Sequence, residues 1–109
     1  MNKWIGVDLD GTLAYYESYH VNAKTIGEPI PLMLNRVKSW LADNKKVKIF
    51  TARVAGGGLE QDVQRSLVEE WSEKHIGQKL EVTCVKDWQM VELWDDRAIQ
   101  VKKNTGEKI

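Results

Sequence analysis

The sequence predicts an α/β fold with a mostly parallel central sheet, and two observations lead to this prediction. Short apolar runs typical of strands alternate with longer amphipathic runs typical of helices, in the order strand, helix, strand, helix, strand, strand. Polar side chains also follow directly after several of these strands, where parallel sheets place their ligand sites. A length of 109 residues suits one domain, so we treat residues 1–109 as a single unit.

The first half of the chain contains a strand, a loop and a helix. Residues 4–9 form a nearly continuous apolar run typical of a strand buried on both faces. Residues 11–30 show no clear period and predict a loop or small hairpin. Pro31 favours a helix start, and the helix is expected over residues 31–45. Its apolar residues fall on one stripe: Met33, Leu34, Val37, Trp40 and Leu41.

The middle of the chain predicts a second strand and a second helix. Residues 46–51 read as the strand, and the glycine-containing stretch 52–58 reads as a flexible connection. The helix is expected over residues 59–77, because an apolar residue recurs every fourth position and Gly77 favours a stop. The residues of that repeat are Leu59, Val63, Leu67 and Trp71.

The last third of the chain predicts two more strands, over residues 79–85 and 90–96. Residues 98–109 are expected to add an edge strand and a tail. Cys84 lies within the first of these strands and is expected to be a small buried apolar residue rather than a nucleophile.

The composition argues against several functional classes. Sixteen basic and sixteen acidic residues cancel, so no net charge attracts the protein to nucleic acid or to an anionic membrane. No apolar run is long enough for a membrane span, and we find no signal-peptide pattern. A single cysteine excludes an internal disulfide. We therefore expect a cytoplasmic protein.

Acidic residues from distant parts of the chain are expected at one edge of the sheet. Asp8 and Asp10 follow the first strand, and Asp95 and Asp96 follow the fourth. Neighbouring carboxylates repel one another unless a cation lies between them. Hard oxygen ligands with open positions suit Mg²⁺, which also binds phosphate oxygens. The sequence therefore predicts a Mg²⁺ site that accepts a phosphorylated substrate.

Other residues near the same edge have chemistry suited to phosphate. Thr51 ends the second strand and offers a hydroxyl, and Lys86 lies just beyond the third strand and offers a positive charge. The amides around Gly11 and Thr12 could bind phosphoryl oxygens. Arg53 lies near Thr51 in the sequence, and we include it as a substrate-binding candidate.

Four motifs in order resemble those of the haloacid dehalogenase (HAD) superfamily of phosphohydrolases. They are "DLDGTL" at 8–13, "KIFTAR" at 48–53, Lys86, and "ELWDDRA" at 92–98. The resemblance covers the chain from Ile5 to about Ile99. The wider pattern, including "IGEPIP" and "IFTARV", is similar to small uncharacterised phage and bacterial members.

The resemblance implies a role for each matching residue. Asp8 would be the nucleophile that forms an aspartyl phosphate, and Asp10 would be the general acid and base. The Asp8 carboxylate, the Asp10 main-chain carbonyl and Asp95 would hold Mg²⁺. Asp96 would reach the metal through water or anchor Lys86. Lys86 and Thr51 would bind the transferring phosphoryl group.

The resemblance also implies a Rossmann-like three-layer sandwich without a cap domain, because neither gap between the motifs has room for one. Residues 14–28 would then be the only local lid over an open site. They include four candidates for substrate contact: Tyr15, Tyr16, Tyr19 and His20. The expected substrate is a small phosphorylated molecule.

Two other functions stay open on the sequence alone. A capless site could admit a polynucleotide end, although the chain lacks the basic surplus that binding to the phosphate backbone favours. A non-catalytic receiver module also combines acids, a threonine and a lysine around Mg²⁺. Its phosphate-accepting aspartate would follow a middle strand, where this chain has Thr51. Arg97 could clamp substrate or pair with a neighbouring carboxylate.

Overall fold

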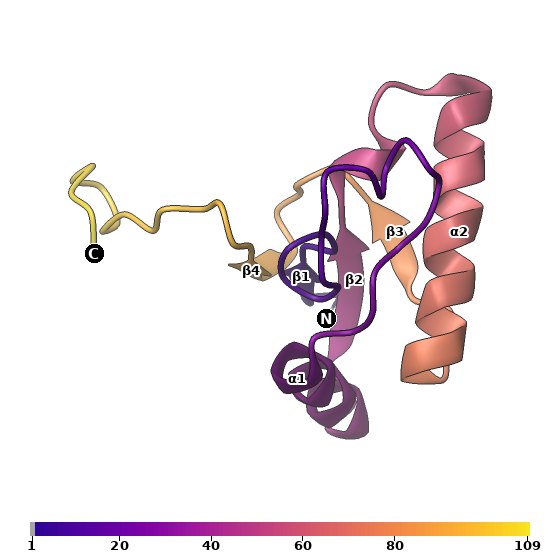
Figure 1. Ribbon diagram of the computed structural model, residues 1–109. Helices are drawn as coiled ribbons and strands as arrows, with labels where there is room; N and C mark the ends of the chain where they lie inside the picture. Colours follow the sequence, from indigo (N-terminus) through magenta and orange to yellow (C-terminus); the bar gives the residue numbers. More distant parts are fainter. Residues whose placement is uncertain (1) are drawn as a thin grey trace.

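A computed structural model describes residues 2–109 and contains a four-stranded sheet with two helices (Figure 1). The strands are β1 (Trp4–Val7), β2 (Lys46–Phe50), β3 (Glu81–Thr83) and β4 (Met90–Trp94). The helices are α1 (Pro31–Ala42), α2 (Gly58–Ile76) and the short 3₁₀ turn η1 (Ala52–Val54). The strand order is β3-β2-β1-β4, and every pairing is parallel. The predicted α/β class with a parallel sheet is confirmed.

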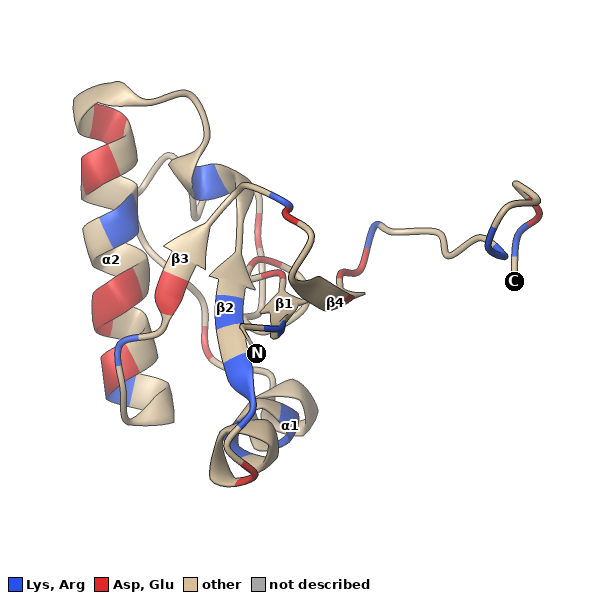
Figure 2. Ribbon diagram, turned by 180° about the vertical axis from the view of Figure 1, so that it is seen from behind, with Lys and Arg blue, Asp and Glu red and all other residues tan. Residues whose placement is uncertain are grey.

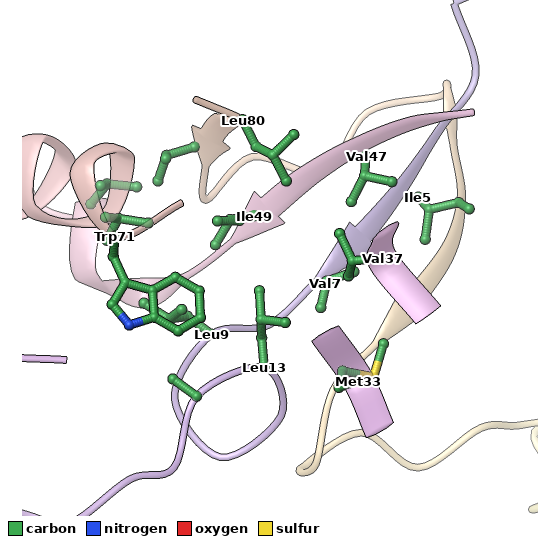
Figure 3. Packing of buried hydrophobic residues seen from close by; sticks show 14 residues of the cluster. Ile5, Val7, Leu9, Leu13, Met33, Val37, Val47, Ile49, Trp71 and Leu80 are labelled. Carbon is green, nitrogen blue, oxygen red and sulfur yellow. The ribbon is translucent and has the colours of Figure 1, made fainter. Parts of the chain in front are cut away.

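The main core lies on one face of this sheet. The strand register places Ile5 beside Val47 and Val7 beside Ile49, so these side chains point to the same side. Both helices pack on that side, because their buried apolar residues join the same cluster (Figure 3). The helix residues in that cluster are Met33 and Val37 of α1 and Val68 and Trp71 of α2. The stripe predicted for the first helix is therefore the one that packs.

The opposite face carries no helix within residues 2–109, so the chain forms two layers rather than the expected three. The reason is the connection between β3 and β4, residues 84–89, which contains no helix. On this helix-free face the Trp4 ring lies 6.5 Å from that of Phe50, and the Lys48 ammonium lies 4.4 Å from the Trp4 ring. The Trp4 indole also donates to Asp87 at 3.0 Å, which fixes the connection against the sheet.

Helix α2 packs with only part of the face that the four-residue repeat predicted. Trp71 is in the core and Leu67 is half-buried, but the first turns of the helix differ. Leu59 is 84% exposed and Val63 is also exposed, whereas Gln64 and Ser72 are buried. Gln64 occupies the packed face because its side-chain oxygen accepts a hydrogen bond from the buried guanidinium of Arg53, at 3.1 Å. The first turns of the helix therefore pack through a polar contact, which an apolar repeat does not show.

Two predicted segments also differ in conformation. The stretch predicted as a flexible connection begins with the turn η1, in which Arg53 and Val54 are buried. Residues 98–109 form no strand with the sheet and contain one isolated bridge, Val101 to Lys108. Within residues 2–109, no helix is both long and apolar enough to cross a bilayer.

Candidate functional site

Three strands end at the edge of the sheet where the candidate site lies. Asp8 follows β1, Thr51 follows β2, and Asp95 follows β4. Because these strands are parallel neighbours, their ends meet around one cavity of about 530 Å³. The residues that line it are Asp8, Asp10, Tyr16, Val21, Phe50, Thr51, Ala52, Arg53, Ala55, Cys84, Asp95, Asp96 and Arg97.

Three carboxylates form an acidic cluster in this cavity: Asp8, Asp95 and Asp96. One oxygen from each lies within 4.8 Å of the others. Burial raises the pKa of Asp8 from 3.8 to about 7, helped by a hydrogen bond to Asp96 and by the negative charges of Asp95 and Asp96. Burial and the neighbouring carboxylates therefore favour the protonated form of Asp8.

Thr12 holds two members of the acidic cluster together. Its Oγ1 lies 3.3 Å from Asp8 Oδ2 and 3.1 Å from Asp96 Oδ1, and it accepts the Asp96 backbone N–H at 2.9 Å. Its one proton serves either carboxylate at a time. Gly11 permits the close approach, because a Cβ on it would lie 2.7 Å from Asp96 Oδ2 and its φ is +93°.

Asp10 lies outside the acidic cluster and forms a bidentate pair with Arg53. Arg53 Nε lies 2.7 Å from Asp10 Oδ2, and Arg53 Nη2 donates to Asp10 Oδ1 at 2.8 Å. The guanidinium is almost fully buried and also donates to Gln64 and to the carbonyl oxygen of Thr25. The Asp10 side chain is therefore directed toward Arg53 and away from the acidic cluster.

The structure brings most of the other predicted residues to the cavity. Thr51 is buried, and its side-chain oxygen accepts the Arg53 backbone N–H at 3.2 Å, so it caps η1 while lining the cavity. Gly11 and Thr12 adjoin the acidic cluster. Lys86 is exposed and does not line the cavity. The neighbouring contact between Asp87 and Trp4 directs this part of the chain over the helix-free face.

The loop residues predicted to contact substrate divide into two groups. Tyr16 lines the acidic cavity, together with Val21. Tyr15, Tyr19 and His20 line a separate hollow beside residues 26–31. His20 is also buried, and its Nδ1 accepts the backbone N–H of Glu17 at 2.8 Å, which indicates a role in shaping the loop.

Sequence reasoning missed the polar residues that support Arg53. Gln64 and Thr25 satisfy the guanidinium hydrogen bonds that Asp10 leaves free. The one signal in the sequence was Gln64, a glutamine on the packed side of the second helix. A search for repeating apolar residues does not detect it. Arg97 is exposed and lines the cavity, and its backbone N–H donates to Asp95 at 2.8 Å.

Among solved structures, the chain is similar to a conserved protein from Bacteroides thetaiotaomicron. The TM-score is 0.58 at 20% sequence identity, over 87% of this chain and 76% of that chain. At this identity the likeness concerns the fold, and it supports the α/β architecture described above. No family model and no curated protein matches the chain.

Proposed function

We propose that this protein is a Mg²⁺-dependent phosphomonoesterase of the HAD type. The observation that carries the proposal is the acidic cluster, in which Asp8 faces two further carboxylates beside Thr51 at the carboxyl edge of a parallel sheet. The order of the four sequence motifs supports the same assignment. The substrate class is a small phosphorylated molecule.

The donor set of the acidic cluster fits Mg²⁺. Asp8, Asp95 and Asp96 offer hard carboxylate oxygens. The pKa of Asp8 is raised mainly by burial and further by the negative charges of Asp95 and Asp96, which a cation would offset. When bound there, the ion would neutralise phosphoryl oxygens and favour attack by an anionic nucleophile. Partial exposure of Asp95 and Asp96 leaves room for water and phosphate ligands.

Asp8 would carry the covalent chemistry. One of its carboxylate oxygens attacks phosphorus, the bond from phosphorus to the substrate oxygen breaks, and an aspartyl phosphate forms. The departing alkoxide takes up one proton and leaves as an alcohol. A water molecule then attacks phosphorus, loses a proton, and releases inorganic phosphate while the Asp8 carboxylate is restored.

Asp10 would donate the first proton and accept the second, as the resemblance implies. In the structure its two oxygens bond to Arg53, so proton transfer requires one oxygen to turn toward the reacting group. Arg53 would keep its hydrogen bonds to Gln64 and Thr25 during that rotation, because neither involves Asp10. The guanidinium would therefore stay in position while Asp10 turns, because Asp10 is not its only hydrogen-bond partner.

The remaining cavity residues would bind the phosphoryl oxygens. Thr51 can still donate its hydroxyl proton, because its hydrogen bond with Arg53 uses only the oxygen. Arg97 lines the cavity and can supply positive charge. Lys86 would join them only if residues 84–89 moved toward the cavity.

Phosphate release from an aryl phosphate tests the proposal directly. Asp8→Asn is expected to lower kcat by roughly five orders of magnitude, as when other enzymes lose a covalent nucleophile. EDTA should abolish the activity, and added Mg²⁺ should restore it. Asp62→Asn, an exposed acid on α2 away from the cavity, is the matched control and should keep full activity.

Two results would overturn the phosphatase proposal. One is the absence of phosphate release from a broad panel of monoesters by Mg²⁺-loaded protein. The other is a phosphorylated protein that persists for hours after treatment with acetyl phosphate, which is the behaviour of a receiver module.

A further inference from the structure

The cavity at the candidate site has room for more than a phosphate group. Its volume of about 530 Å³ is in the range that holds a whole small-molecule ligand. The acidic cluster, Thr51 and Arg97 are the groups that would bind Mg²⁺ and the phosphoryl oxygens. Apart from the paired Asp10 and Arg53, the other lining residues are apolar or aromatic. We call them the apolar lining: Tyr16, Val21, Phe50, Ala52, Ala55 and Cys84.

Part of the apolar lining lies beside Asp10, the general acid of the proposed reaction. Asp10 bonds to Arg53, and Gln64 contacts both Arg53, at 3.1 Å, and the carbonyl oxygen of Val21, at 3.4 Å. Arg53 itself belongs to η1, which also carries Ala52 of the apolar lining. A leaving oxygen that takes its proton from Asp10 must lie within hydrogen-bond reach of that acid. The rest of the leaving group therefore extends along Val21 and η1.

The loop that carries Tyr16 and Val21 is already held in position. The side-chain amide of Gln64 donates to the carbonyl oxygen of Val21, and the Trp71 indole donates to that of Gly27 at 3.0 Å. Both donors belong to α2, so the helix anchors the loop at two points. An anchored loop loses little conformational freedom when a ligand binds, which favours affinity.

The charge of the cavity leaves no cation for a second phosphate. Four carboxylates and two guanidiniums line it, and one Mg²⁺ would balance the difference. Lys86 lies outside the lining. Figure 2 shows the basic residues of β2 toward the start of the strand, away from the carboxyl end where the cavity lies. A leaving group with its own negative charge would therefore gain no partner among the residues that line the cavity.

We infer that the substrate is a phosphomonoester whose leaving group is an uncharged, mainly apolar group with an aromatic ring, and that Tyr16 selects this ring by packing against it. The inference rests on the proposed function, because it concerns the leaving group of the same reaction. The polar side chains nearest the apolar lining, Asp10, Arg53 and Gln64, are bonded to one another. The hydroxyls of a sugar would lose water there without gaining a full set of partners.

The first test measures binding without turnover, by isothermal titration of the Mg²⁺-loaded full chain with two phosphonates. These compounds have no phosphate ester bond to hydrolyse. Phenethylphosphonate should bind about tenfold more tightly than ethylphosphonate, because its ring is removed from water in the apolar lining. Equal affinities, or no binding of either compound, would overturn the inference.

Substitution of Tyr16 tests its role in that preference. Tyr16→Ala should remove most of the preference for phenethylphosphonate, whereas Tyr16→Phe keeps the ring and should keep the preference. Tyr19→Ala is the matched control. It lies in the same loop but lines the separate hollow, and its ring lies 4.4 Å from that of His20, compared with 6.1 Å for Tyr16.

That control separates ring selection from a general loosening of the loop. Loosening around His20 would appear in Tyr19→Ala at least as strongly as in Tyr16→Ala, because the Tyr19 ring is the closer of the two. A preference that survives Tyr16→Ala, or that Tyr19→Ala removes equally, would overturn the role of Tyr16.

Hydrolysis separates this inference from the proposed function. Benzyl phosphate and glycerol phosphate both release a primary alcohol, so kcat/KM about tenfold higher for benzyl phosphate would report recognition of the ring. Equal values, with phosphate released from both esters, would overturn the aromatic leaving group and leave the phosphatase assignment in place. A protein that releases phosphate from neither ester, nor from the broader panel, contradicts the proposed function itself.

Discussion

Asp8 and Asp10 are separated by one residue, yet their two carboxylates lie in opposite electrostatic environments. Asp10 is neutralised by a bidentate pair with the buried Arg53. Asp8 faces Asp95 and Asp96, and its pKa rises to about 7. The charge of Asp10 is therefore balanced within the protein itself. In the acidic cluster, by contrast, three carboxylates lie together and make it harder for Asp8 to lose its proton.

The difference follows from what each backbone position can reach. Asp10 points toward η1 and α2, where Arg53 is already held by Gln64. Asp8 points toward the end of β4, where it faces Asp95 and Asp96 and lies 3.3 Å from the hydroxyl of Thr12. We infer that the Asp10 pair fixes the loop in advance, so that the acidic cluster keeps its arrangement before a cation binds.

Removing Arg53 tests whether that pair holds the loop. Arg53→Met should lower the free energy of unfolding by about 3–5 kcal/mol, because breaking a buried ion pair leaves its other charge without a partner. Urea unfolding measures this directly. Arg97→Met is the control, since Arg97 is exposed, and it should change the stability by less than about 0.5 kcal/mol. Equal losses for the two variants would contradict the comparison.

The pH dependence of Mg²⁺ binding tests the acidic cluster. Because the pKa of Asp8 is raised from 3.8 to about 7, the folded protein holds this proton more tightly than the unfolded chain. Its contribution to stability is complete below pH 3.8 and is lost as the pH rises through about 7. Mg²⁺ must displace the proton, so its affinity should increase about tenfold from pH 6 to pH 8.

Isothermal titration with MgCl₂ at constant ionic strength measures that affinity. Asp8→Asn is the control, because it removes the titrating group and should remove most of the pH dependence along with much of the affinity. An affinity for the wild-type protein that stays constant between pH 6 and pH 8 would mean that Asp8 does not bind the ion.

Much of the fold could be predicted from the sequence, because alternating apolar segments fix the class of fold. The prediction was wrong where a contact outside the apolar pattern decided the outcome. In the first turns of α2, Gln64 packs and reaches Arg53 where the repeat predicted Leu59 and Val63. The third layer is missing because residues 84–89 form no helix. Neither feature changes the spacing of apolar residues, so neither could be read from it.

The sequence predicted correctly those residues of the candidate site whose position is determined by the end of a strand. Asp8, Thr51 and Asp95 meet because parallel strands place their carboxyl ends at one edge. Lys86 lies outside the cavity because its position depends on the path of a loop, which the Trp4 contact with Asp87 directs elsewhere. The pairing of Asp10 with Arg53 joins positions 43 residues apart, and the sequence carries no marker for it.

Thr12 offers the finest test, because its neutral hydroxyl lies within hydrogen-bond distance of both Asp8 and Asp96. Thr12→Val keeps the shape and removes the proton, and should cost about 1 kcal/mol of stability. The hydroxyl lowers the pKa of Asp8, so its loss should move the pH midpoint of Mg²⁺ binding upward. Thr12→Ser keeps the hydroxyl and should keep the midpoint. A downward shift of the midpoint in Thr12→Val would mean that the hydroxyl stabilises the protonated form of Asp8 rather than its ionised form.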